Sequence, residues 1–263
     1  MGGRGSQSSF TVKGPAMPRQ QVQQQAQQPV QNQTPDPNNT PVTVDALTNM
    51  AQMTDDQLAA LYRQSISVDM PNHLNDAPDA TQKFAFAAGL NEKPAVLDDA
   101  DFDQFLKDNS IPRNQIISRS VDSITFKSGG ISYQYTAQMI TDMMKYSALN
   151  YVGGKHGGQA FGAGTYFDMD GGGNTGYGSG ATAIAVLNPQ TARVIRYDDL
   201  MSKVSSFSRS HPKFASAVGG FSSRNASVYA LAMGYNVIAG TGGRSSYRNV
   251  IDRKALVYRK SNL

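Results

Sequence analysis

The 263-residue sequence contains no cysteine and no tryptophan, and only one of its acidic residues, Glu92, is a glutamate. Without cysteine the chain can form no disulfide bond, no thiolate zinc site and no cysteine nucleophile. Its longest apolar run, ATAIAVL at 181–187, is far shorter than the roughly 20 residues that a membrane-spanning helix needs. No charged and then apolar segment opens the chain, so we expect neither a secretory signal peptide nor a membrane partner.

The net charge is modest, at +4 with an isoelectric point near 9.2. A mildly basic chain suits an anionic ligand or a weak contact with nucleic acid. Because the basic residues near the C-terminus are scattered over predicted strands, they are more typical of a solvated face, and we do not expect nucleic acid to be the main partner. These residues are Arg244, Arg248, Arg253, Lys254, Arg259 and Lys260.

Composition divides the chain into three regions. Residues 1–44 are rich in glutamine and proline, with nine glutamines between positions 20 and 33, and cannot bury enough apolar surface to order themselves. We therefore expect a disordered tail at 1–44, a helical region at 45–110 and a main domain at 111–263.

Local patterns predict a mixture of short helices and strands. Thr54 and Gln57 form a capping box, and Leu58, Leu61, Tyr62 and Ile66 share one helical face. Further helices are expected at 79–90, 98–106, 133–149, 198–207 and 223–233, with a turn at 91–96. Strands are expected at 114–121, 123–128, 181–187, 192–197, 235–239, 247–251 and 255–258. This irregular order indicates an α+β fold and not a repeating βαβ sheet.

Several common site motifs are absent. The sequence has no GxxxxGK[ST] loop and no GxGxxG between a strand and a helix, which argues against P-loop and Rossmann sites. Asp168 and Asp170 begin like a calcium loop, but Ser179 stands where a bidentate glutamate is needed. The histidines, His73, His156 and His211, do not have the spacing of a metal site.

The segment GGQAFGAGTYFDMDGGGNTGYG at 157–178 has nine glycines around two tyrosines, Tyr166 and Tyr177. Glycine lets the backbone approach a flat ligand closely, and two tyrosine rings can stack on such a ligand. The alternative is a surface loop whose tyrosines belong to the core.

This segment resembles the nicotinamide-binding segment of ADP-ribosyltransferases, which contains a strand of the form G-x-G-x-Y-F and a later tyrosine. Upstream, IISRSVDS resembles the first core strand of the family's arginine branch, known from phage-encoded members, and places Arg119 at the arginine position. The resemblance covers roughly residues 80–260. The residues that match the glycine-tyrosine motif are Gly162, Gly164, Tyr166, Phe167 and Tyr177.

The resemblance implies an ADP-ribosyltransferase-like split β-sheet core preceded by a helical extension, with NAD as the substrate. Arg119 would hold the pyrophosphate or the adjacent ribose, since a guanidinium binds phosphate oxygens in a bidentate way. Gly162 or Gly164 would hold the nicotinamide carboxamide, Tyr166 and Tyr177 would stack on its ring, and the hydroxyl of Thr165 would lie near the ribose. Phe167 belongs to the same cofactor-binding strand.

The implied reaction transfers one ADP-ribose from NAD to a protein acceptor, which would be a host protein if the chain is phage-encoded. We accordingly expect the protein in the host cytoplasm or in a virion.

The chain departs from the family at the glutamate of a late strand, which binds a ribose hydroxyl and stabilises the developing cation. The corresponding position falls near Ser246, Tyr247 or Asn249, and the nearest carboxylate is Asp252, which we take as a catalytic candidate together with Arg119 and Thr165. The alternative is a non-catalytic virion-associated protein that reuses the fold and contacts other virion proteins through its glutamine-rich tail.

Overall fold

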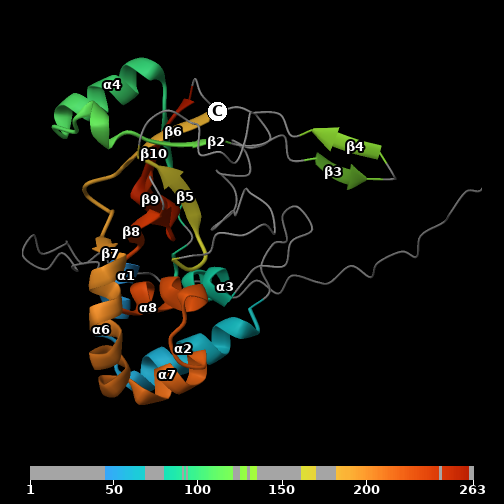
Figure 1. The fold of residues 1–263 in the computed structure, drawn as a ribbon, viewed down its shortest axis with the longest axis vertical. Coiled ribbons are helices and arrows are strands. Elements are labelled where there is room, and N and C mark those ends of the chain that lie inside the picture. The colour runs from blue at the N-terminus through green and yellow to red at the C-terminus, as the bar shows by residue number, and fades with distance from the viewer. Residues whose placement is uncertain are drawn as a thin grey trace, which may run out of the picture. The chain divides into compact units, whose positions relative to one another are not determined.

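The computed structural model describes residues 45–68, 80–90, 92, 94–120, 125–128, 131–134, 161–169, 182–242 and 245–260. These residues belong to one compact unit, Thr43–Leu263, which combines a large mixed sheet with a group of helices (Figure 1). The α+β class that the sequence predicts is therefore confirmed.

The described part of the main sheet has eight strands, and most neighbours are antiparallel. Its strands are β1 (Ala95–Leu97), β2 (Ile117–Ser120), β5 (Thr165–Asp168), β6 (Thr182–Leu187), β7 (Val194–Arg196), β8 (Val237–Gly242), β9 (Ser245–Val250) and β10 (Leu256–Arg259). They lie in the order β1-β10-β6-β2-β5-β9-β8-β7, with β1 parallel to β10 and β7 parallel to β8. Strands β3 (Thr125–Ser128) and β4 (Ile131–Gln134) pair with each other in a separate ladder. The strand β5, which carries Tyr166 and Phe167 of the glycine-tyrosine motif, thus lies near the middle of the sheet.

The helices fall into two groups. Helix α4 (Asp99–Asp108) packs on β10 and β1, whereas the others pack on one another and on the β7–β8 side of the sheet (Figure 1). This second group consists of α1 (Ala46–Gln52), α2 (Asp55–Ile66), α3 (Ala80–Ala87), α6 (Tyr197–Ser210), α7 (Pro212–Val218) and α8 (Ala226–Ala232). Short 3-10 turns occur at η1 (Arg113–Gln115), η2 (Ser223–Asn225) and η3 (Arg253–Ala255). None of the described helices is both long and apolar enough to cross a bilayer.

Helix α2 begins as its sequence predicts. Thr54 Oγ1 accepts a hydrogen bond from Gln57 N at 3.3 Å, and Gln57 Oε1 accepts one from Thr54 N at 2.8 Å, which completes the capping box. Leu58 and Tyr62 are buried on the predicted face. Ile66, which belongs to the same face in the sequence, is 53% exposed, because it is the last residue of the helix and the chain turns away directly after it.

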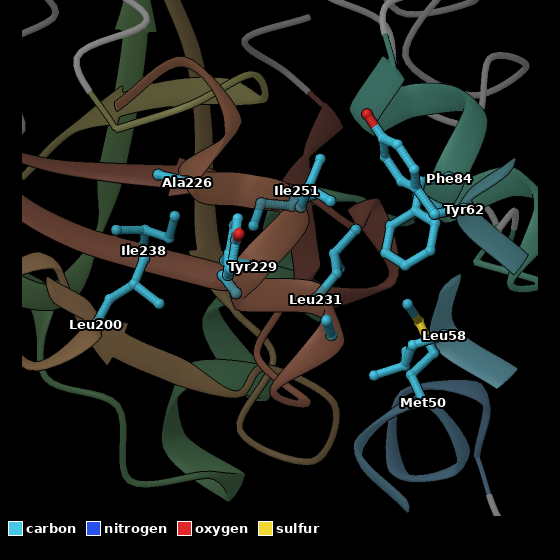
Figure 2. Close-up of a cluster of buried hydrophobic side chains, with 14 of the residues drawn as sticks. Met50, Leu58, Tyr62, Phe84, Leu200, Ala226, Tyr229, Leu231, Ile238 and Ile251 are labelled. Carbon is cyan, nitrogen blue, oxygen red and sulfur yellow. The ribbon is translucent and has the colours of Figure 1, made fainter. Parts of the chain in front are cut away.

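One hydrophobic cluster joins the early helices to the later ones. Figure 2 shows Met50 of α1, Leu58 and Tyr62 of α2 and Phe84 of α3 in the same cluster as Tyr229 of α8. The ring of Phe84 lies edge-on to Tyr62 with centroids 5.5 Å apart and lies 6.0 Å from the ring of Phe214 in α7. The helical region that precedes residue 111 therefore shares a core with the elements that follow residue 182.

Alternation along β5 assigns its side chains to the two faces of the sheet. Tyr166 packs on the helical cluster, whereas Phe167 belongs to a second cluster with Ile117, Val250 and Tyr258. A third cluster, formed by α4 with Val186 and Val257, fills the space between α4 and the sheet.

Two local predictions differ from the structure, and one helix of the structure was not predicted. The expected turn at 91–96 overlaps β1, because residues 95–97 gain their hydrogen bonds from parallel pairing with β10, which local sequence does not reveal. The helix expected at 133–149 is wrong at its start, where Tyr133 and Gln134 belong to β4, and the rest of it lies outside the described residues. Helix α7 was not expected, because its N-terminus is capped by a side chain from α2.

Candidate functional site

The glycine-tyrosine segment lies between the two strands on which the resemblance also depends. Ser118 of β2 pairs with Asp168 at one edge of β5, and Asn249 of β9 pairs with Tyr166 at the other. The three strands β2, β5 and β9 are therefore direct neighbours, although Ser118 and Asn249 are far apart in the sequence.

The two glycines of the motif are in close contact with their surroundings. Gly162 has a φ of +85°, and a Cβ there would collide with Ser227 Oγ and lie 2.5 Å from Ser227 N. A Cβ on Gly164 would collide with Asn249 Oδ1 and lie 2.9 Å from Val250 O. Both positions require glycine, because the turn before β5 packs directly on α8 and β9.

Two buried polar side chains hold the carbonyl groups of this turn. Ser227 Oγ donates to Ala163 O at 2.6 Å, and Asn249 Nδ2 lies 3.0 Å from Phe161 O, 3.2 Å from Gly162 O and 3.2 Å from Ser227 Oγ. The amide orientation of Asn249 is fixed, since an oxygen in place of Nδ2 would face only acceptors on the turn. Neither residue is exposed to solvent.

The opposite end of the Asn249 amide has no such partner. Asn249 Oδ1 is buried without a hydrogen bond among the described residues. An unsatisfied buried oxygen costs about 1–3 kcal/mol. The hydrogen bonds of Asn249 to the turn are therefore accompanied by a loss of folding free energy at Oδ1.

Tyr166 also stabilises the turn. Its hydroxyl donates to Gly162 O at 2.6 Å and accepts from Phe161 N at 3.0 Å, and its ring stacks on the ring of Phe161 with centroids 6.3 Å apart. Tyr166 is half-buried and packs on the helical cluster. The tyrosine therefore fixes the shape of its own segment, whatever ligand it contacts.

Thr165 and Phe167 lie on the other face of the sheet from Tyr166. Thr165 pairs with Val250, a member of the cluster that contains Phe167, and the two side chains are 3% and 0% exposed. A ligand that stacks on Tyr166 would therefore approach the opposite side of the strand from the side chain of Thr165.

The backbone of Arg119 lies in β2, where it pairs with Ala183 of β6. Ser118, the residue before it, occupies the position opposite Asp168 and is fully buried. Tyr177, the second tyrosine of the predicted ring stack, lies outside the described residues, as do Asp170 and Ser179 of the calcium-like sequence.

The three positions at which the resemblance would place a glutamate differ in their surroundings. Ser246 pairs with Thr241, Tyr247 pairs with Asp168 and Gly240, and Asn249 pairs with Tyr166. Asn249 is thus the residue of β9 directly beside the motif tyrosine, and its side chain ends in a neutral amide. Sequence reasoning missed its contact with the turn, because the carbonyls that it binds are 86–88 residues away.

Asp252 lies in a different place, at a polar cavity of about 110 Å³ whose lining includes no residue of 161–169. Its side chain is 3% exposed, and it accepts hydrogen bonds from Lys254 N at 3.1 Å and from Asn236 Nδ2 at a longer 3.4 Å. Burial raises the pKa of the Asp252 carboxyl above its ordinary value, although these two donors oppose the change. The structure therefore does not bring Asp252 to the glycine-tyrosine turn through any described contact.

The basic residues near the C-terminus do not form one exposed patch in the described structure. Arg253 is 1% exposed, and burial lowers the pKa of its guanidinium to about 10. Lys254 pairs with Glu92, Arg259 with Asp99 and Lys260 with Asp98. Arg248 is half-buried, and Arg244 lies outside the described residues.

No metal-binding group of three or more acidic or histidine side chains occurs among the described residues. Comparison with known proteins finds no family model, no curated protein and no solved structure that matches the chain.

Proposed function

We propose that the chain is an ADP-ribosyltransferase-like protein that binds NAD and transfers a single ADP-ribose to a protein acceptor. The observation that carries the proposal is the adjacency of β2, β5 and β9 in the sheet. These strands bear Arg119, the glycine-tyrosine motif and the position of the missing glutamate, which a dinucleotide site would need close together.

The proposed site has groups that could bind NAD, but β9 places no carboxylate beside Tyr166 that could stabilise the transition state. The amide of Asn249 beside Tyr166 is neutral and cannot stabilise a cationic sugar as a carboxylate does. Loss of one preorganised electrostatic contact commonly lowers a rate by about two to three decades. We therefore expect measurable NAD binding and slow transfer.

Calorimetric titration of the full chain with NAD tests the binding step. Arg119→Ala and Tyr177→Ala should each weaken NAD binding at least about tenfold, the effect of losing roughly 1.4 kcal/mol of contact. Arg113→Ala is the matched control, because Arg113 is an exposed arginine of η1 outside the motif. An absence of binding by the unmodified chain, or equal affinity in all three variants, would exclude the proposed site.

The second candidate is a non-catalytic protein, one associated with a virion if the chain is phage-encoded, that keeps the fold for interaction. It is favoured by the observation that the Tyr166 hydroxyl and the Asn249 amide both bind the backbone of the turn before β5. Incubation with NAD and a lysate, followed by mass spectrometry, separates the two. The transferase produces an ADP-ribose adduct on a protein, whereas the interaction protein produces none.

A further inference from the structure

The cavity beside Asp252 lies at the N-terminal end of α1. Asn236, which directly precedes β8, and Asp252, which follows β9, are part of its polar lining. The apolar wall of the cavity is formed by Ala46, Leu47 and Leu90. One water needs about 10–15 Å³ of such space, so a volume of about 110 Å³ accommodates several waters or a small organic group.

The two cations that line the cavity form salt bridges with carboxylates other than Asp252. Arg193 Nη2 lies 2.6 Å from Asp45 Oδ2, and Lys254 Nζ lies 2.6 Å from Glu92 Oε1. Asp252 interacts electrostatically with Lys254 and Arg253, but no described residue forms a salt bridge with it.

The Asp252 carboxylate also has unused hydrogen-bonding capacity. An ionised carboxylate offers about four acceptor positions, and the two donors that reach it are one backbone N–H and one distant amide. A buried carboxylate is costly to keep charged, and the raised pKa of Asp252 reflects that cost, although the charge of Lys254 opposes the change. A cation bound in the cavity would lower the cost of keeping this carboxylate charged.

We propose that this cavity binds an alkylammonium group, with the ammonium on Asp252 and the alkyl chain against Ala46, Leu47 and Leu90. The ammonium supplies the donors that the carboxylate lacks, and the apolar wall favours an alkylated cation over a bare metal ion. Asn236, held in place by Arg193 N and Thr191 O, keeps the carboxylate oriented toward the cavity. This inference is independent of NAD binding.

Titration of the full chain with n-butylamine hydrochloride, followed by protein NMR, tests the proposal. We expect saturable binding with a dissociation constant on the order of 1 mM, which is reasonable for five non-hydrogen atoms. The backbone amide of Lys254 and the side-chain amide of Asn236 should shift, because both donate to Asp252. The neutral isostere n-butanol should not bind.

Asp252→Asn should weaken the amine at least about tenfold, since it removes the charge while Asn can still cap η3. Asp199→Asn, an exposed position in α6, is the matched control and should bind as the unmodified chain does. Should Asp252→Asn fail to fold, the butanol comparison and the location of the shifts in the unmodified chain decide the question.

Failure to saturate, equal binding of butanol, or shifts confined to other regions would each overturn the proposal. So would a folded Asp252→Asn variant that binds the amine unchanged. The ammonium group has two natural sources, a free diamine or the lysine side chain of another protein. Separate titrations with 1,4-diaminobutane and with an Nα-acetyl-lysine amide distinguish them. Tighter binding of the diamine indicates a free diamine, and tighter binding of the lysine derivative indicates a lysine side chain.

Discussion

Two glycines with nearly the same backbone angle provide a test of the packing around the motif. Gly162 has a φ of +85° and Gly219 a φ of +82°, but a Cβ on Gly219 would meet no atom within 4 Å. Gly219→Ala should therefore cost only the left-handed backbone strain of about 1–2 kcal/mol. Gly162→Ala adds displacement of Ser227 and should cost more than about 3 kcal/mol.

Urea unfolding of both variants gives these values directly. Equal destabilisation of the two would mean that the turn before β5 can move away from α8, and that Ser227 does not fix it. A large difference would establish that the turn is rigid before any ligand binds.

At the residue scale, the sequence identifies the motif but not its surroundings. Gly162, Gly164 and Tyr166 are visible as a pattern because they lie within five positions of one another. Ser227 and Asn249 carry no local signal, since a single serine in a helix or asparagine in a strand has many roles. Their contacts depend on how α8 and β9 pack on the turn, and that arrangement is a property of the whole fold.

At the scale of elements, helix α7 depends on a side chain from another helix. Its own N-cap residue, His211, makes no side-chain cap, whereas Asp55 of α2 accepts from Lys213 N at 3.0 Å and from Phe214 N at 2.9 Å. These are two of the backbone donors that every helix leaves free at its start. Although burial opposes it, these hydrogen bonds lower the pKa of the Asp55 carboxyl below its ordinary value of 3.8.

Asp55→Ala should therefore lower the melting temperature clearly at neutral pH. A carboxyl whose pKa is depressed by folding contributes its full stability above 3.8 and loses it as the pH falls through the lower folded-state value. The difference between the variant and the unmodified chain should accordingly diminish in strong acid. Thermal melts across this pH range measure it.

Asp56→Ala is the control for this prediction. Asp56 is the next residue, but it forms only an exposed salt bridge with Lys213 Nζ at 2.7 Å, and such pairs contribute little. If both variants melt at the same temperature, the cap from α2 is not what stabilises α7.

The same comparison explains which elements could be predicted. Helix α2 has its capping box within four consecutive residues, so its start is evident from sequence. Helix α7 is capped by a residue 158 or 159 positions away, and β1 exists only because it pairs with β10. The start of α2 is therefore predictable from local sequence, whereas α7 and β1, which depend on distant partners, are not.

At the scale of the molecule, the helical region before residue 111 and the sheet region after it share one core. Phe84 of α3 is fully buried against Tyr62 and Phe214, and α1 and α3 both pack on α8. The glycine-tyrosine turn packs on the same helix α8 through Ser227. The early helices therefore support the candidate site indirectly, through the element that holds it.

Phe84→Ala should destabilise the whole described unit by about 3–5 kcal/mol, the usual cost of removing a buried phenylalanine. Because the core is shared, amide protons of α2 and of β8 and β9 should lose protection together in a single cooperative transition. Hydrogen exchange under increasing urea measures both regions in one experiment. Ile66→Ala, at an exposed position of α2, should leave the transition almost unchanged. If α2 instead opens in Phe84→Ala while β9 stays protected, the early helices are a separate folding unit, and residues 111–263 should then fold and bind NAD without them.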